Sequence, residues 1–367
     1  MEESLYSVNK FKKDDIRAVN AKFEAQKIAF APLAFQAIKS MMNLNILKVI
    51  EDAGDDGIST QDIAKKTGIS EYGVAVLCEM ALGMYVLKLT DDSDEKYKLG
   101  KIGWFLLEDD LTKANFWFTN DICYQGAWDL EKSIVNGKPE GLKVFGDQWT
   151  TVYEALSALP EKAKKSWFDF DHFYSDIAFP EALPIVFSKN PKTIVDIGGN
   201  TAKWSITCCH YNPDVKMTIV DLPGQTAVAE QNAKKEGFEN RISTYSGNVL
   251  DDTTVLPKNP DAFWMSQFLD CFSLHQVTKI LKKVHEAASA NSIIYVLEPL
   301  WDKQRFEAGS YDLQATSLYF TCIANGNSKM YRFQELVNAI ESAGFKLDCS
   351  HHGLGSNSYT LLAFKKA

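Results

Sequence analysis

The chain has 367 residues, of which 46% are hydrophobic and 24% charged, and its formal net charge at pH 7 is −9. These values are typical of a folded globular protein of about two domains and argue against a partner with a phosphate backbone. No apolar run approaches the ~18 residues that a membrane span needs, and the first residues lack the pattern of a signal peptide. Seven cysteines without metal-like spacing predict neither a metal site nor disulfides. We therefore expect a cytoplasmic protein that binds neither nucleic acid nor membrane.

The first 110 residues follow a helix, turn, helix and hairpin pattern. Apolar residues recur at three- and four-residue spacing over residues 21–50, which predicts one or two helices. Ser59 or Thr60 is placed to cap a short helix, and Ser70 to cap a second one over residues 71–82. Residues 85–89 and 97–99, separated by an acidic turn, predict a hairpin. This order is typical of a winged helix.

The charge of this region argues against DNA binding. Residues 45–100 contain six basic and eleven acidic residues, a net charge of −5, and the helix predicted over 71–82 has no Lys or Arg. A protein that reads DNA needs these side chains for phosphates and guanine edges. We therefore interpret the region as a packing and dimerisation module.

Residues 111–185 are rich in aromatic side chains. Two helices, over 111–135 and 151–164, are expected to connect the two domains. Most of the aromatic residues should pack within these helices, while those flanked by polar residues are candidates for the wall of an apolar ligand pocket. These candidates are Trp128, Trp149, Phe168, Phe170 and Tyr174.

A glycine turn divides two apolar runs in the second half of the chain. Residues 193–197 read as a strand, Gly198 and Gly199 as a tight turn, and a second apolar run ends at Asp221. Glycines allow backbone N–H groups to approach a ligand closely, and an acid at the end of the second strand can bind ribose hydroxyls. This pattern predicts a site for an adenosine-bearing molecule.

The end of the chain decides between two kinds of α/β domain. Further strands are predicted over 241–246, 261–266 and 292–299, with helices over 276–288 and 333–343. The last two strands, 345–349 and 359–364, are joined by a short loop of Gly, Ser and Asn, which predicts an antiparallel hairpin. Such an ending favours a methyltransferase sheet over a nicotinamide-binding domain, and an NAD-dependent oxidoreductase remains the remote alternative.

Four short segments carry a resemblance to a known family. They are Val-Asp-Ile-Gly-Gly at 195–199, Val-Asp-Leu-Pro at 220–223, Gly-Asn at 247–248 and Ala-Gly-Phe at 343–345. With them the chain resembles S-adenosylmethionine-dependent small-molecule O-methyltransferases of the plant caffeate and bacterial polyketide-tailoring type. The resemblance implies a mainly helical winged-helix dimerisation domain (1–110), a helical linker and acceptor-pocket segment (111–185) and a Rossmann-like cofactor domain (186–367).

The resemblance also implies an activity. A homodimer would transfer the methyl group of S-adenosylmethionine to a hydroxyl, or a ring carbon, of a small aromatic or polyketide-like acceptor, leaving S-adenosylhomocysteine. The cofactor residues that it implies are Asp196, Gly198, Gly199, Asp221, Leu222, Asn248, Val249, Ser266 and Phe272. Four of the positions around the cofactor depart from the family pattern, since Asn200 and Ala202 replace glycines, Ser266 replaces a lysine and Asn248 stands where the family usually has Asp.

The largest departure lies at the catalytic motif. The family reads Leu-His-Asp-Trp, with His as the general base, whereas residues 269–272 are Leu-Asp-Cys-Phe, so that Asp270 replaces the base. Of the two Glu residues that orient that His, one is retained as Glu298 and the other is Met330 here. We expect Asp270 and Glu298 to be catalytic, with burial near Glu298 raising the pKa of Asp270.

Two alternatives remain open at this point. Asp270 can instead form only local hydrogen bonds, and His275 or His172 are weaker candidates for the base. The lost His, the lost Glu and the replaced glycines also allow a methyltransferase scaffold that is retained as a ligand-binding or regulatory protein.

Overall fold

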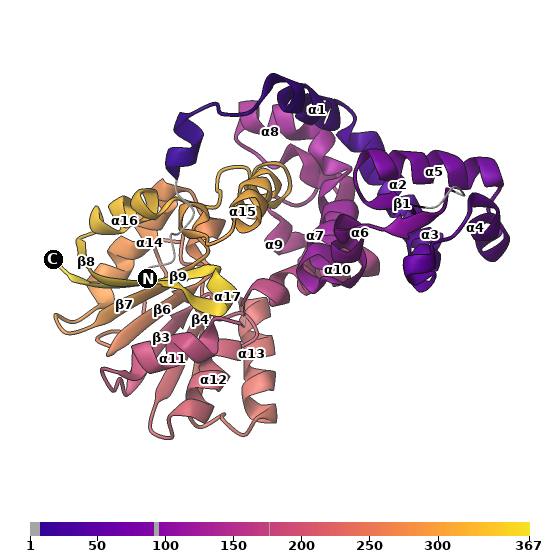
Figure 1. Cartoon of the computed structure of the whole chain (residues 1–367). Helices are drawn as coiled ribbons and strands as arrows, with labels where there is room; N and C mark the ends of the chain where they lie inside the picture. Colours follow the sequence, from indigo (N-terminus) through magenta and orange to yellow (C-terminus); the bar gives the residue numbers. More distant parts are fainter. Residues whose placement is uncertain (1–7, 92–94, 176) are drawn as a thin grey trace. The chain divides into compact units, whose positions relative to one another are not determined.

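The computed structural model describes residues 8–91, 95–175 and 177–367, and it divides into two compact units (Figure 1). One unit comprises Phe11–Trp117, and the other comprises Phe118–Ala367 together with residues 8–10. The helical segment from Phe118 onward is grouped with the C-terminal sheet.

The N-terminal unit is a helical domain with a small hairpin. Its elements are α1 (Ala18–Ala29), α2 (Ala31–Asn43), α3 (Ile46–Asp52), α4 (Thr60–Thr67), α5 (Glu71–Gly83), β1 (Leu87–Leu89), β2 (Tyr97–Leu99), α6 (Lys101–Glu108) and α7 (Asp110–Phe118). Ser59 accepts a hydrogen bond from the N–H of Asp62, and Ser70 from that of Gly73, so both predicted caps are confirmed. Apolar residues of α2 to α5 form one buried core, whose fully buried members include Met41, Leu47 and Ile63. The strands β1 and β2 pair antiparallel, with Leu87 opposite Leu99.

The C-terminal unit is built on a seven-stranded sheet in the order β5-β4-β3-β6-β7-β9-β8. Its strands are β3 (Thr193–Ile197), β4 (Lys216–Asp221), β5 (Ile242–Ser246), β6 (Ala262–Ser266), β7 (Ile293–Glu298), β8 (Phe345–Gly353) and β9 (Tyr359–Lys366). The first five pair in parallel, whereas β9 pairs antiparallel with both β7 and β8. This arrangement confirms the predicted α/β class and the terminal hairpin.

Helices cover both faces of this sheet (Figure 1). On one face lie α11 (Phe179–Phe187), α12 (Lys203–Tyr211), α13 (Pro223–Lys235) and the short α17 (Leu354–Asn357); on the other lie α14 (Leu274–Ala287) and α16 (Phe333–Glu341). Each face has its own apolar core, because the strand residues alternate between them. Val195 and Phe263 belong to one core, while Ile194 and Trp264 belong to the other.

A third apolar core lies among α8 (Leu130–Asn136), α9 (Val152–Ala155), α10 (Glu161–Ser175) and α15 (Glu307–Tyr319). The two long helices expected here are interrupted. The chain over 111–135 passes from α7 through a π-helical turn at Thr119–Cys123 and a 3-10 turn at Gly126–Asp129 into α8. The helix expected over 151–164 ends before Pro160, and α10 begins after it, because proline lacks the N–H that a helix interior needs. No helix among the described residues is long and apolar enough to cross a membrane.

Candidate active site

The C-terminal unit contains a cavity of about 700 Å³ at the carboxyl ends of its parallel strands. Gly198 follows β3, Asp221 ends β4, Gly247 follows β5 and Gln267 follows β6, and all of them line this cavity. Its other walls come from α9, α10, α15 and the segment after α15. Ligands of open α/β sheets bind at this edge of the sheet. The cavity is therefore the candidate active site.

The glycine turn after β3 leaves no room for a side chain. Gly198 has a φ of +77°, and a Cβ added there would lie 2.2 Å from the ring of Phe268. Asn200 and Ala202, which replace family glycines, also have positive φ values, 45° and 70°. The backbone thus keeps the left-handed conformation of glycine, at a cost of roughly 1–2 kcal/mol for a residue such as alanine.

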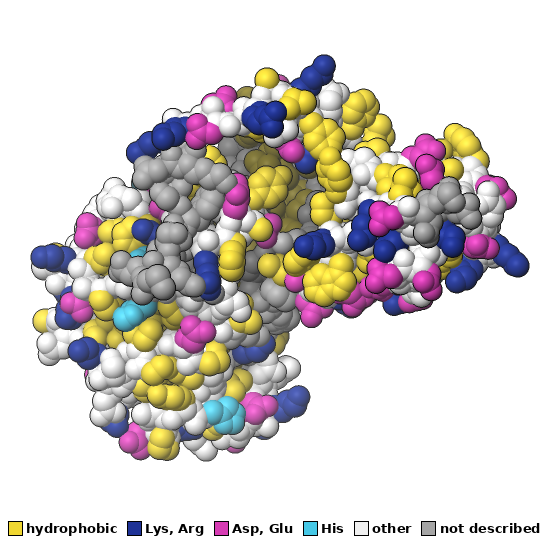
Figure 2. Space-filling view, viewed as in Figure 1, with side chains coloured by type: hydrophobic (Ala, Val, Ile, Leu, Met, Phe, Trp, Pro, Cys, Tyr) yellow, Lys and Arg dark blue, Asp and Glu magenta, His cyan; other side chains and the backbone are white. Residues whose placement is uncertain are grey.

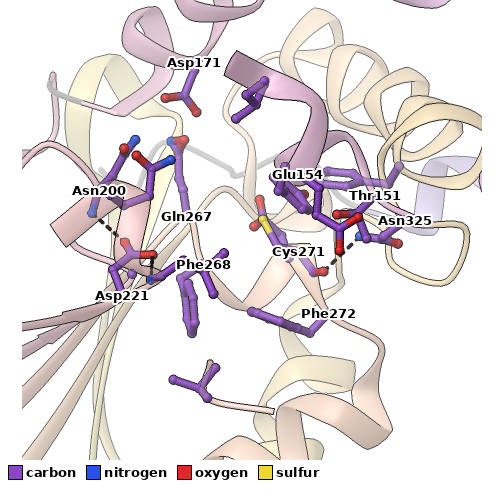
Figure 3. Close-up of a pocket in the computed structure, with 18 of the residues that line it drawn as sticks. Thr151, Glu154, Asp171, Asn200, Asp221, Gln267, Phe268, Cys271, Phe272 and Asn325 are labelled. Carbon is purple, nitrogen blue, oxygen red and sulfur yellow. Dashed lines mark hydrogen bonds between the residues drawn. The ribbon is translucent and has the colours of Figure 1, made fainter. Parts of the chain in front are cut away.

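The carboxylate of Asp221 is held in place by the backbone around it. One oxygen accepts from the N–H of Asn200 at 2.9 Å, and the other from the N–H of Leu222 at 2.7 Å (Figure 3). Burial raises the pKa of Asp221, and these two backbone hydrogen bonds lower it. Because each carboxylate oxygen can accept a second hydrogen bond, the group can still bind a diol.

The structure brings most of the predicted cofactor residues to the cavity. Those that line it are Gly198, Asp221, Leu222, Asn248, Val249 and Phe272. The amide oxygen of Asn248 already accepts the N–H of Leu250 at 2.9 Å, which fixes the side chain and leaves one acceptor position.

Three predicted cofactor residues, Asp196, Gly199 and Ser266, do not line the cavity. Asp196 is buried under the turn, where it accepts from the hydroxyl of Ser205 at 2.7 Å, and burial raises its pKa to about 7. A Cβ on Gly199 would lie 2.9 Å from the Asp196 carboxylate, so the two residues pack against each other at the turn.

Asp270 lines the cavity from the short turn Leu269–Cys271, and its side chain is only 6% exposed. Its Oδ1 atom is buried without a hydrogen-bond partner. Burial raises the pKa of Asp270 to about 6, which confirms the direction expected from the sequence. A carboxylate with this pKa can accept a proton from a ligand in the cavity.

Glu298, at the end of β7, lies behind this turn and does not line the cavity. Its Oε1 accepts from the backbone N–H groups of Phe268 at 3.1 Å and Leu269 at 2.8 Å, while its Oε2 is buried without a partner. Burial, followed by the charge of Asp270, raises the pKa of Glu298 well above its usual value. Glu298 therefore positions the turn that carries Asp270.

Aromatic side chains from the helical segments form part of the cavity wall. Trp167, Phe170, Tyr153, Tyr319 and Phe320 line the cavity, and Trp167 donates to the hydroxyl of Tyr319 at 2.8 Å. The ring of Phe170 stacks on Phe118 with the centroids 3.9 Å apart.

Of the five predicted acceptor residues, only Phe170 is among the described residues that line the cavity. Trp149 and Phe168 pack against the third core instead, and Trp128 is 91% exposed. The side chain of Tyr174 lies outside the part of the chain that the structure describes.

Sequence reasoning missed several polar residues of the cavity. Gln267 has a left-handed backbone and donates to the hydroxyl of Tyr359, and Asn325 donates to the backbone oxygen of Cys271 at 2.9 Å (Figure 3). Glu154 and Asp171 also line the cavity, one from α9 and the other from α10. For these residues the sequence offered one signal, because Asp171 directly follows Phe170, which was predicted to line an acceptor pocket.

The two other candidates for the base are His275 and His172. His275 is exposed and does not line the cavity, and the side chain of His172 lies outside the described residues. Met330, at the position of the lost Glu, is buried and lines the cavity as an apolar residue. Within the described part of the chain, no group of three or more His, Cys, Asp or Glu side chains is placed to hold a metal ion.

Two family models match the chain. Residues 22–97 match a Dimerisation2-like domain, and residues 129–346 match an O-methyltransferase domain. The second match covers more than half of the sequence.

Individual proteins match over most of the chain. The L-tyrosine C(3)-methyltransferase of Streptomyces lavendulae is 20% identical over 323 residues, which cover 87% of this chain and 85% of the relative. The S-adenosylmethionine-dependent methyltransferase SibL in its apo form superposes with a TM-score of 0.70 at 19% identity, covering 93% of this chain and 98% of that one. An O-methyltransferase from neocarzinostatin biosynthesis, in complex with S-adenosylmethionine and 2-hydroxy-5-methyl naphthoic acid, gives a TM-score of 0.60 at 18% identity, with 92% and 96% covered.

Proposed function

We propose that this chain, which belongs to the family of O-methyltransferase domains, transfers the methyl group of S-adenosylmethionine to a small aromatic or polyketide-like acceptor. The receiving atom is a hydroxyl oxygen or a ring carbon. One observation carries the proposal: a single cavity joins the glycine turn and Asp221 to Asp270 and an aromatic wall. The family match and the antiparallel end of the sheet leave the oxidoreductase alternative without support.

The residues around the turn fit the cofactor. Asp221 would bind the ribose hydroxyls, because it lines the cavity and backbone N–H groups hold its two oxygens in place. Gly198 would lie against the methionine part, while Leu222 and Asn248 would border the adenine. When bound, S-adenosylmethionine supplies a methyl group that is activated by the positive sulfonium. The chain has to align the acceptor with that methyl group, an effect that can lower the barrier by about 7–11 kcal/mol.

Asp270 is the proposed general base for a hydroxyl acceptor. A phenol has a pKa of about 10, and an ordinary Asp of ~3.9 lies about 6 units below it, a gap of roughly 8 kcal/mol. Because burial raises the pKa of Asp270 to about 6, the gap shrinks to about 4 units or ~5.4 kcal/mol. That value is close to the ~3.5 units that separate a phenol from an ordinary His. Burial therefore gives Asp270 nearly the basicity of the His that it replaces.

Glu298 acts through Asp270, as a group that positions the turn carrying it. Its Oε1 atom holds the N–H groups of Phe268 and Leu269, directly before Asp270. Its raised pKa means that one carboxyl of the pair tends to keep a proton while the other is ionised.

The N-terminal unit supports a homodimer, since residues 22–97 match a Dimerisation2-like domain. A cytoplasmic location fits the seven cysteines, which are all free in the structure. On the face drawn in Figure 2, Lys and Arg side chains lie interspersed with Asp and Glu side chains. We keep the expectation that the protein binds no nucleic acid.

Release of S-adenosylhomocysteine in the presence of a panel of phenolic and naphthoic acceptors tests the proposal. Turnover with at least one acceptor, reduced in the Asp270→Asn variant, is the expected result. Binding of S-adenosylmethionine without turnover on any acceptor would instead favour a ligand-binding protein on a methyltransferase scaffold.

A further inference from the structure

The wall of the cavity is acidic, and Lys203, whose charge acts on Asp171, does not line it. The described residues that line it include four acids, Glu154, Asp171, Asp221 and Asp270, and no Lys, Arg or His. Asp221 is held on both oxygens by backbone N–H groups and belongs to the cofactor end. The other three acids come from α9, α10 and the turn after β6. An aromatic hydroxyl alone does not account for three carboxyl groups.

Asp270 keeps one oxygen atom open to a ligand, while hydrogen bonds from Cys271 act on its carboxyl group. Its side chain is 6% exposed and lines the cavity, and its Oδ1 atom has no hydrogen-bond partner. A buried ionised carboxylate costs several kcal/mol unless a cation or hydrogen-bond donors compensate it. Whatever binds next to Asp270 therefore gains by supplying positive charge or donors.

Asp171, on α10, is a second acid of the cavity whose pKa is raised. Burial, and then the charge of Asp270, raises the pKa of Asp171 to about 7, and the positive charge of Lys203 lowers it by less. Lys203, the first residue of α12, does not itself line the cavity. In Figure 3 Asp171 points from its helix toward Gln267 and the open space between them. Asp171 and Asp270 thus line the same cavity, and the charge of Asp270 acts on Asp171.

Glu154 differs from these two residues. Its side chain is exposed, and its carboxylate accepts from the backbone N–H of Thr150 at 3.0 Å and from the Thr150 hydroxyl at 2.9 Å. Water and these hydrogen bonds screen its charge, so Glu154 contributes less to ligand selection than Asp171.

From this arrangement we infer that the methyl acceptor carries a protonated amine, which Asp171 receives while Asp270 faces the reacting hydroxyl. The inference rests on the proposed function and adds the charge of the acceptor to it. An acceptor with a carboxylate is disfavoured, because the same acids repel it inside a cavity of low dielectric.

The cofactor's own charge does not explain the acids. S-adenosylmethionine carries a positive sulfonium together with the ammonium and the carboxylate of its methionine part, so its single net positive charge offsets at most one of the three acids. S-adenosylhomocysteine keeps the ammonium and the carboxylate but lacks the sulfonium and has no net charge, so in its complex with the protein any preference for a charged acceptor comes from the acceptor itself.

The test compares three catechols of similar shape, titrated by calorimetry into the protein saturated with S-adenosylhomocysteine. Dopamine carries an amine, 4-methylcatechol is neutral and 3,4-dihydroxyphenylacetate carries a carboxylate. We expect dopamine to bind about tenfold more tightly than the acid, a difference of ~1.4 kcal/mol, with the neutral compound between them. Asp171→Asn should remove most of this preference, whereas the matched variant Glu154→Gln should retain most of it.

Three results would overturn the inference: the acid binding as tightly as the amine, no binding of dopamine at millimolar concentration, or an unchanged preference in Asp171→Asn. If Asp171→Asn instead weakens S-adenosylmethionine relative to S-adenosylhomocysteine and leaves the catechols unaffected, the acids serve the cofactor and the inference fails. Failure of the wild-type protein to bind S-adenosylhomocysteine is a different outcome, because it refutes the proposed function itself.

Discussion

Replacing Asp270 by Asn removes the proposed base while keeping the size of the side chain. An amide cannot take the proton of a phenol, so the contribution of general base catalysis is lost, typically 10²–10⁴-fold in rate. Proton transfer from a phenol to Asp270 is feasible in the wild-type protein, because burial raises the pKa of Asp270 to about 6, within about 4 units of the pKa of a phenol. We therefore expect turnover to fall at least ~10²-fold.

The pH profile separates this role from simple damage to the site. A base must be deprotonated to act, so kcat/KM of the wild-type enzyme should rise as the pH increases through about 6 and level off above it. The Asp270→Asn variant should lack this rise. Release of S-adenosylhomocysteine measures both rates, and calorimetry with S-adenosylhomocysteine controls for an intact cofactor site.

A loss below about fivefold, or a variant that keeps the inflection near pH 6, would refute the reasoning. The alignment of donor and acceptor would then supply most of the rate, and another group would accept the proton. Rescue by Asp270→His gives an independent check, because an ordinary His has a pKa of ~6.5 and restores a base at the same position.

Asp221→Ala should weaken S-adenosylhomocysteine binding at least ~10-fold in calorimetry, because hydrogen bonds to a charged group contribute about 1.5–3 kcal/mol each; unchanged affinity would place the ribose elsewhere. Glu298→Ala leaves the N–H groups of Phe268 and Leu269 without their acceptor, so urea unfolding should show a loss of about 1–3 kcal/mol, and a fully stable variant would contradict the positioning role. Gly198→Ala should reduce both stability and cofactor affinity, since the new Cβ would lie 2.2 Å from the Phe268 ring; a variant that binds normally would show that the turn can shift.

The order of the elements could be predicted from the sequence because each one carries a local signal. Ser59 and Ser70 are helix caps in the structure as expected, and the terminal hairpin follows from its short loop. The interruption of the expected helices at Gly126 and Pro160 was missed. Gly126 packs against another segment, since a Cβ there would lie 2.7 Å from the backbone oxygen of Gly141, a contact that periodicity cannot reveal.

The candidate site was predictable where backbone conformation and residue type agree. Gly198 and Asp221 line the cavity because a turn and a strand end place them there. The acceptor wall was not predictable in the same way, because aromatic residues of a helical segment divide between core and cavity according to tertiary packing. Phe170 reaches the cavity, whereas Trp128, in the same segment, is 91% exposed.

The central claim is that the cavity beside the glycine turn binds S-adenosylmethionine. Calorimetry of the whole protein with S-adenosylmethionine, S-adenosylhomocysteine and NAD tests it most directly. We predict that the first two bind with one site per chain, that both are weakened by Asp221→Ala, and that NAD gives no measurable heat. Absence of binding by S-adenosylmethionine, or binding of NAD with similar affinity, would contradict the claim.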